Sequence, residues 1–182
     1  MTNPPARPGH GPPGAGPLRI LGLDPGLRRT GWGVVACAGS RLSLMAHGTV
    51  TVAEGGAMAS RLCALLDALC GIVEAHAPHE AAAEEVFVNA NGRSSLLLGQ
   101  ARACALLAPG RAGLPVAEYN TVTVKKAVVG TGTADKAQVG FMVRRLLPGV
   151  GEAGADACDA LAVAVTHAHL RTARERLREA AA

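Results

Sequence analysis

Residues 18–37 read LRILGLDPGLRRTGWGVVAC, and the pattern of this stretch decides the fold. Its first part, residues 18–24, is a short apolar run followed by Pro-Gly, which is typical of a buried strand that ends in a turn. Residues 30–37 and 42–52 have the composition of two further strands, separated by a Gly-Ser turn. Three strands joined by short turns predict an antiparallel meander.

The chain after this meander alternates between helical and strand patterns. Residues 58–76 carry leucine, isoleucine and valine at helical spacing, which predicts an amphipathic helix. This order of elements predicts an α/β fold built on a five-stranded mixed sheet, with helices on both faces. The remaining strands are expected at 81–88 and 115–119, and the remaining helices at 93–108, 121–128, 136–147 and from residue 155 onward.

The composition indicates one domain preceded by a tail. Residues 1–17 are dominated by Pro and Gly and are expected to be disordered, so the domain spans residues 18–182. The net charge of +4 suits a polyanionic partner without requiring one. The five cysteines show no CxxC spacing and are expected to be reduced. The sequence has no apolar run long enough for a bilayer and no signal-peptide pattern. We therefore expect a soluble, cytoplasmic protein.

Acidic residues occur at two places in the apolar strands. Asp24 ends the first strand, where it could simply cap the Pro-Gly turn. Glu84 and Glu85 lie within AAAEEVFV, and because adjacent strand residues point to opposite faces, at most one of them faces a given site. A carboxylate in a buried strand is costly unless it is paired or binds a cation. The alternative is an edge strand with both acids in solvent.

Asp156 and Asp159 are three residues apart at the start of the last predicted helix and therefore share one helical face. Helix capping explains one of them, whereas two repel each other and a divalent cation would relieve that repulsion. If the first and fourth strands are neighbours and the last helix packs beside them, Asp24, one of the two glutamates and the two helix aspartates form a cluster of oxygen ligands. Such a cluster is suited to Mg²⁺ or Mn²⁺. Two such ions can activate a water and stabilise the leaving oxygen in phosphodiester hydrolysis.

Five stretches of the chain resemble, in order, the conserved blocks of the RuvC-type Holliday junction resolvases. The resemblance implies a ribonuclease H-like fold and a homodimer that nicks a four-way DNA junction in two strands, leaving 5′-phosphate ends. It also implies two Mg²⁺ ions per active site, with Mn²⁺ as a substitute, and a role in recombination and repair beside the branch-migration proteins RuvA and RuvB. The stretches are ILGLDPGLRRTGWGVV, AAEEVFVNAN, LGQARACALLA, VKKAVVGTGTADKAQV and ADACDALAVAVTHAH.

The catalytic, metal-binding acids implied by this resemblance are Asp24, Glu84, Asp156 and Asp159. Within the glutamate pair, Glu84 is the residue at the matching position, because it precedes Glu85 and the Val-Phe dipeptide.

Three further residues match positions that the family uses to bind DNA. Lys125 and Lys136 resemble basic residues close to the scissile strand, and Phe87 resembles an aromatic residue that stacks on an unpaired base. Taken without the resemblance, both lysines read as solvated surface residues and Phe87 as a core residue. The same resemblance places residues 93–108 at the dimer interface, although this helix could equally pack on its own sheet.

Two histidines in the last predicted helix, His167 and His169, are two residues apart and do not share a helical face. They match no metal-binding pattern such as HExxH. We therefore expect them at the surface or at the helix end.

Three other functions are compatible with parts of the pattern. An actin-like or sugar-kinase-like ATPase shares the Asp-x-Gly turn, but it needs a second related domain for which this chain is too short. A module that binds branched nucleic acid without cutting it would gain nothing from buried acids near phosphates. A nuclease acting on RNA–DNA hybrids would use the same acids, and only the family resemblance favours four-way junctions.

Overall fold

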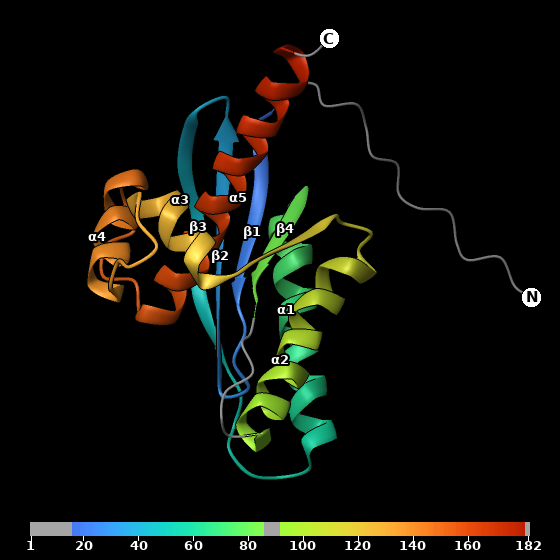
Figure 1. Cartoon of the computed structure of the whole chain (residues 1–182). Helices are drawn as coiled ribbons and strands as arrows, with labels where there is room; N and C mark the ends of the chain where they lie inside the picture. The colour runs from blue at the N-terminus through green and yellow to red at the C-terminus, as the bar shows by residue number, and fades with distance from the viewer. Residues whose placement is uncertain (1–15, 86–91, 181–182) are drawn as a thin grey trace, which may run out of the picture.

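The meander predicted at the start of the chain forms one half of a five-stranded sheet (Figure 1). The strands are β1 (Leu18–Asp24), β2 (Arg29–Ala38), β3 (Arg41–Thr51), β4 (Glu80–Glu84) and β5 (Val116–Tyr119). In this computed structural model, which describes residues 16–85 and 92–180, β1 pairs antiparallel with β2, and β2 pairs antiparallel with β3. Strands β4 and β5 lie parallel to β1, in the order β3-β2-β1-β4-β5. The predicted mixed sheet is confirmed.

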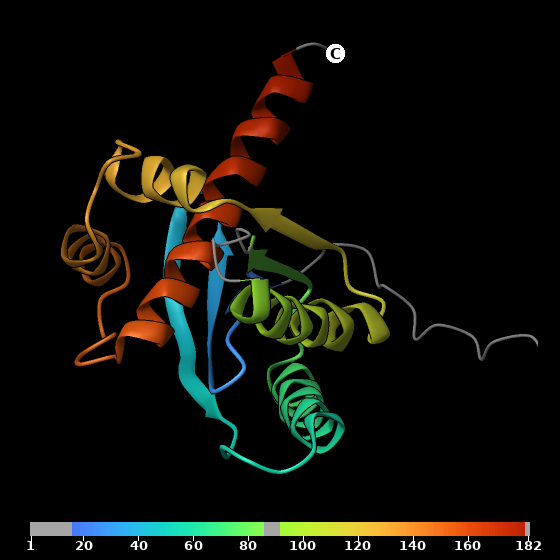
Figure 2. The same cartoon turned by 60° about the horizontal axis from the view of Figure 1, so that its bottom comes forward.

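Helices cover both faces of this sheet (Figures 1 and 2). They are α1 (Met58–His76), α2 (Gly92–Arg111), α3 (Thr121–Val129), α4 (Lys136–Leu146) and α5 (Ala155–Ala180). One apolar core joins the sheet to α1 and α2, and a second joins it to α3, α4 and α5. Within the described ranges, no helix has the length and apolar character needed to span a bilayer.

The alternation of side chains along β1 determines which residues face α5. Ile20 lies in the core under α3, α4 and α5, whereas Leu21 and Leu23 lie in the core under α1 and α2. Because successive strand residues point to opposite faces, Asp24 falls on the same face as Ile20. The end of β1 therefore directs an acidic side chain toward α5.

Helix α5 approaches the sheet closely because glycines line its path across β1 and β2. A Cβ at Gly22 would collide with the backbone of Ala160, and one at Gly31 would collide with the backbone carbonyl of Asp156. A Cβ at Gly33 would meet the side chain of Leu161 at 2.5 Å. Since glycine lacks a Cβ, the first turns of α5 rest directly on the strands. This contact places the acids of α5 beside the end of β1.

One sequence prediction is wrong: His167 lies in the core. Its side chain contacts the Tyr119 hydroxyl through Nδ1 at 2.9 Å and Glu80 Oε2 through Nε2 at 2.7 Å. Arg171 Nε also donates to Glu80, at 2.9 Å, and these hydrogen bonds, with that of His167 foremost, lower the pKa of Glu80. His167 is buried because α5 is covered by the sheet on one side and by α3 and α4 on the other. His169 is half-buried beside the Ala127 carbonyl.

The element boundaries differ from the predictions by more than one residue at two places. The strand predicted for residues 81–88 ends at Glu84, and residues 86–88 lie outside the described residues. Helix α2 continues to Arg111, beyond the predicted end at residue 108, with Pro109 inside its last turn. Most of the predicted tail, residues 1–15, also lies outside the described residues, so its disorder stays a prediction.

Candidate active site

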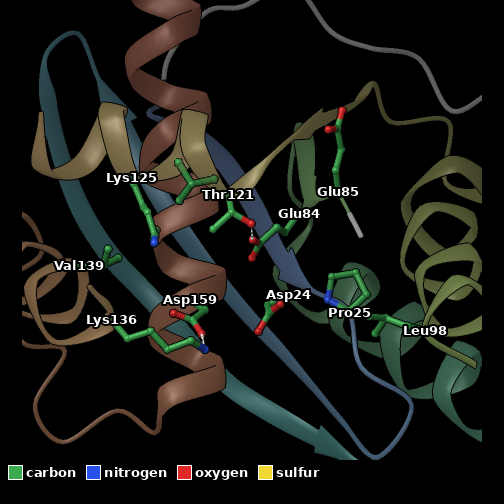
Figure 3. Close-up of a pocket in the computed structure, with 12 residues that line it drawn as sticks. Asp24, Pro25, Glu84, Glu85, Leu98, Thr121, Lys125, Lys136, Val139 and Asp159 are labelled. Carbon is green, nitrogen blue, oxygen red and sulfur yellow. Dashed lines mark hydrogen bonds and ion pairs between the residues drawn. The ribbon is translucent and has the colours of Figure 1, made fainter. Parts of the chain in front are cut away.

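Two acidic side chains lie next to each other where β1 and β4 end. Leu23 pairs with Ala83 in the parallel register of these strands, so Asp24 and Glu84 are the next residues on both. Because β1 and β4 run in the same direction, both acids are on the same edge and on the face covered by α5. Figure 3 shows both carboxylates pointing into one opening.

Helices α2, α3, α4 and α5 supply most of the rest of this opening, which has a volume of about 370 Å³. Asp159 comes from α5, Lys125 from α3 and Lys136 from the first turn of α4 (Figure 3). The pocket is lined by Asp24, Pro25, Glu84, Glu85, Leu98, Thr121, Val124, Lys125, Lys136, Val139, Asp159 and Ala162. Five of the residues predicted to act on DNA thus line one open pocket: Asp24, Glu84, Asp159, Lys125 and Lys136.

Asp156 is described by the structure but is not part of this lining. Asp156 lies one turn before Asp159 on α5, and its Oδ2 accepts a hydrogen bond from Arg29 Nε at 2.6 Å. Phe87 lies outside the described residues, so its stacking role stays a prediction.

Burial and nearby negative charge together raise the pKa values of two acids in the pocket. Burial, followed by the charges of Glu84 and Asp159, raises the pKa of Asp24 to about 7. Burial also raises the pKa of Glu84, against the lowering effect of a hydrogen bond from Thr121. Lys136 partly compensates these acids, because its Nζ lies 2.8 Å from Asp159 Oδ2 and its charge lowers the pKa of Asp24. The hydrogen bond to Asp159 in turn raises the pKa of Lys136.

Glu84 and Glu85 differ in orientation, as strand alternation requires. Glu84 points toward Asp24 and Asp159, whereas Glu85 points away from them (Figure 3). The backbone N–H of Glu85 donates to the carbonyl of Tyr119 at 2.8 Å, which fixes the end of β4 against β5. The geometry therefore agrees with the choice of Glu84 over Glu85.

Thr121 was not predicted from the sequence, and its hydroxyl donates to Glu84 Oε1 at 2.5 Å. Thr121 is the first residue of α3, and the preceding Asn120 caps this helix by accepting from the backbone N–H of Thr123 at 2.8 Å. Asn120 therefore satisfies the helix start, and the Thr121 hydroxyl is directed to the carboxylate instead. The only sequence signal was a hydroxyl residue directly after the strand next to β4.

The chemistry of the pocket acids fits a divalent cation. Carboxylate oxygens are the donors that Mg²⁺ and Mn²⁺ prefer. A bound cation would relieve the repulsion that, after burial, raises the pKa of Asp24. As the side chains stand in residues 16–85 and 92–180, no three potential ligands are grouped so that they could hold one ion. Two of the acids are paired with cations of the protein instead, Asp159 with Lys136 and Asp156 with Arg29.

Comparisons with known proteins identify a family by sequence. The family model described as crossover junction endodeoxyribonuclease RuvC matches residues 20–167. A crossover junction endodeoxyribonuclease RuvC from Caulobacter sp. (strain K31) is 63% identical over 161 residues, which cover 88% of this chain and 95% of that protein.

Two solved structures have a fold similar to that of this chain. Thermus thermophilus RuvC, solved in complex with a Holliday junction substrate, superposes with a TM-score of 0.80 at 31% identity, covering 86% of this chain and 96% of that one. The yeast mitochondrial Holliday junction resolvase Ydc2 superposes with a TM-score of 0.64 over 90% of this chain and 86% of that one, at 14% identity, which supports the ribonuclease H-like fold alone. The family match, the identity to the Caulobacter protein and the acidic pocket lead to one conclusion: this chain belongs to the crossover junction endodeoxyribonuclease RuvC family.

Proposed function

We propose that this protein is a structure-selective endodeoxyribonuclease that resolves four-way DNA junctions by paired symmetric nicks, in homologous recombination and DNA repair. One observation carries the proposal: Asp24, Glu84 and Asp159 converge in an open pocket bordered by Lys125 and Lys136. Membership of the RuvC family supports a DNA junction as the substrate, since the related Thermus thermophilus RuvC was solved with a Holliday junction.

The acids of the pocket would hold the metal ions that this reaction needs. Asp24, Glu84 and Asp159 line the pocket, and Asp156 is one helical turn away. Four carboxylates suffice for two Mg²⁺ ions, with Mn²⁺ as a substitute. When bound, such ions lower the pKa of a water molecule and stabilise the leaving oxygen of a phosphodiester.

The remaining side chains of the pocket bind and orient the DNA strand. Lys125 and Lys136 neutralise phosphate charge at the mouth of the pocket, where they also offset the charge of the acids. Thr121 keeps the Glu84 carboxylate in one orientation through its 2.5 Å hydrogen bond. Phe87 would stack on an unpaired base near the crossover, a contact that contributes about 1–3 kcal/mol in comparable cases.

Paired nicks require two active sites, which a homodimer of this chain would provide. We assign the dimer interface to α2, which presents Leu96 and Leu107 as exposed apolar side chains. RuvA and RuvB would supply the junction through branch migration, and the reaction would take place in the cytoplasm.

The experiment that tests this function compares a synthetic mobile four-way junction with a linear duplex and an RNA–DNA hybrid, with and without Mg²⁺ or Mn²⁺. We expect metal-dependent, symmetric and ligatable nicks in the junction alone. Asp24→Asn is the control, because a contaminating nuclease would remain active in that preparation. Cleavage of the hybrid in preference to the junction would contradict the proposal, and so would tight junction binding without any cut.

A further inference from the structure

Asp156 is held by a residue that has no place in the chemistry proposed so far. Arg29 Nε lies 2.6 Å from Asp156 Oδ2, with 59% of the Arg29 side chain and 29% of the Asp156 side chain exposed. The lining of the pocket in the described residues includes Asp159 but not Asp156. The ion pair therefore holds one of the four acids at the margin of the pocket.

The same close packing that seats α5 on the sheet builds this ion pair. Gly31 faces α5, since a Cβ there would collide with the Asp156 carbonyl. Arg29 precedes Gly31 by two residues on β2 and therefore points to the same face. Its guanidinium thus lies over the first turn of α5, within reach of Asp156.

Each of the two aspartates on α5 has a basic partner in the protein. They lie one helical turn apart, where their charges repel, and a basic side chain close to each carboxylate offsets that repulsion. Lys136 pairs with Asp159, and Arg29 pairs with Asp156. Arg29 carries a permanent positive charge and donates a directional hydrogen bond to Asp156 Oδ2, so it occupies an oxygen atom that a cation would use.

We propose that Arg29 is a positioning residue that holds Asp156 outside the pocket in the metal-free protein and competes with the metal ion for this carboxylate. The inference rests on the proposed metal-dependent function and adds to it a residue that determines the metal affinity. A bound metal ion would replace Arg29 as the partner of Asp156. Asp156 would therefore join the site only when the ion is present. Because the pair is exposed, its loss should change the metal affinity by about two- to fivefold.

The test measures Mn²⁺ binding to the full-length, DNA-free protein by electron paramagnetic resonance of the free ion. Arg29→Gln removes the competing charge and should tighten Mn²⁺ binding by about two- to fivefold. Arg28→Gln is the matched control, because Arg28 is adjacent, 75% exposed and paired with Glu54 instead of Asp156. It removes the same charge and should leave the Mn²⁺ affinity nearly unchanged.

A second pair of variants separates a direct effect from a general change in charge. In the Asp156→Asn background, Arg29→Gln should no longer alter Mn²⁺ affinity, since the contested carboxylate is gone. Unchanged or weaker binding in Arg29→Gln, or the same gain in Arg28→Gln, would overturn the inference. So would a gain that persists in the Asp156→Asn background. If the unsubstituted protein binds no Mn²⁺ at all, the metal site of the proposed function fails, and the inference fails with it.

Discussion

Asp24 and Glu84 end two adjacent parallel strands at the same level, one residue beyond the paired Leu23 and Ala83. Both carboxylates point into the pocket, and after burial the charge of Glu84 is the largest cause of the raised pKa of Asp24. The charge of Lys136 offsets only part of the electrostatic repulsion between these two close, partly buried acids. A bound cation removes that repulsion, which is why we regard the pair as the centre of a metal site.

The two adjacent glutamates provide a matched test of the site. Glu84→Gln should lower the rate of junction cleavage by roughly two orders of magnitude or more, because it removes a metal ligand. Junction binding should be kept, since the substitution removes a negative charge near the phosphates. Glu85→Gln should cleave at nearly the normal rate, because Glu85 points away from Asp24 and Asp159. Equal losses in the two variants, measured as single-turnover rates, would refute the assignment.

The pKa of Asp24 predicts how stability depends on pH in the metal-free protein. This pKa rises from 3.8 to about 7 on folding, so the folded state binds the proton more tightly than the unfolded state. Stability is therefore lost as pH rises from about 4 to about 7, by at most about 4 kcal/mol. An asparagine side chain does not ionise, so Asp24→Asn should raise the melting temperature by several degrees at about pH 8 and by almost nothing at about pH 4. Thermal unfolding in a chelator measures this, and a pH-independent difference would contradict it.

Alanine substitutions of Lys136 and Lys126 compare a lysine in the pocket with one outside it, and so test whether the pocket lysine acts on the substrate. Lys136→Ala should lower the cleavage rate by roughly tenfold or more, because the Lys136 amino group lies among the acids and offsets charge at the phosphate. Lys126→Ala should have little effect, since Lys126 is exposed and lies outside the pocket lining. The measurement is the single-turnover rate at saturating junction. A normal rate in Lys136→Ala would identify Lys136 as an ordinary surface residue.

Thr121 is expected to control the acidic limb of the pH–rate profile. The Thr121 hydroxyl lowers the pKa of Glu84, so Thr121→Val should raise this pKa further and move the onset of cleavage to higher pH. Thr123→Val is the control on the same helix, outside the pocket lining. The measurement is the cleavage rate of both variants across pH at a fixed metal concentration. A profile that drops in height without moving along the pH axis would argue against this role.

Alanine substitutions at two glycines distinguish the effect of close packing on stability from the effect of helix propensity. Gly22→Ala should lower the free energy of unfolding by about 1–3 kcal/mol, because its Cβ would collide with the backbone of Ala160 on α5. Gly71→Ala should instead raise it by about 0.5–1 kcal/mol, since Gly71 lies within α1 with open space around it. Urea unfolding of both variants provides the comparison. A neutral Gly22→Ala would show that α5 does not need this close approach.

Local periodicity explains why so much of the fold could be predicted. The strands and helices follow from apolar spacings of two and about 3.6 residues, which any short segment displays without its neighbours. Asp24 and Asp159 stood out for a similar reason, as charged residues in otherwise apolar segments. Choosing Glu84 over Glu85 was different, because both interrupt the same strand equally and only the family resemblance separated them.

By itself, therefore, the sequence determined the elements of this protein, the order of its helices and strands, and the acids that can serve as metal ligands. The burial of His167, the hydrogen bond from Thr121 to Glu84 and the ion pair of Arg29 with Asp156 follow from the packing of distant segments. These contacts join residues from 37 to 127 positions apart. Their existence depends on how closely α5 packs against the sheet, and that distance is set by the shapes of many residues together, not by the pattern of any one segment.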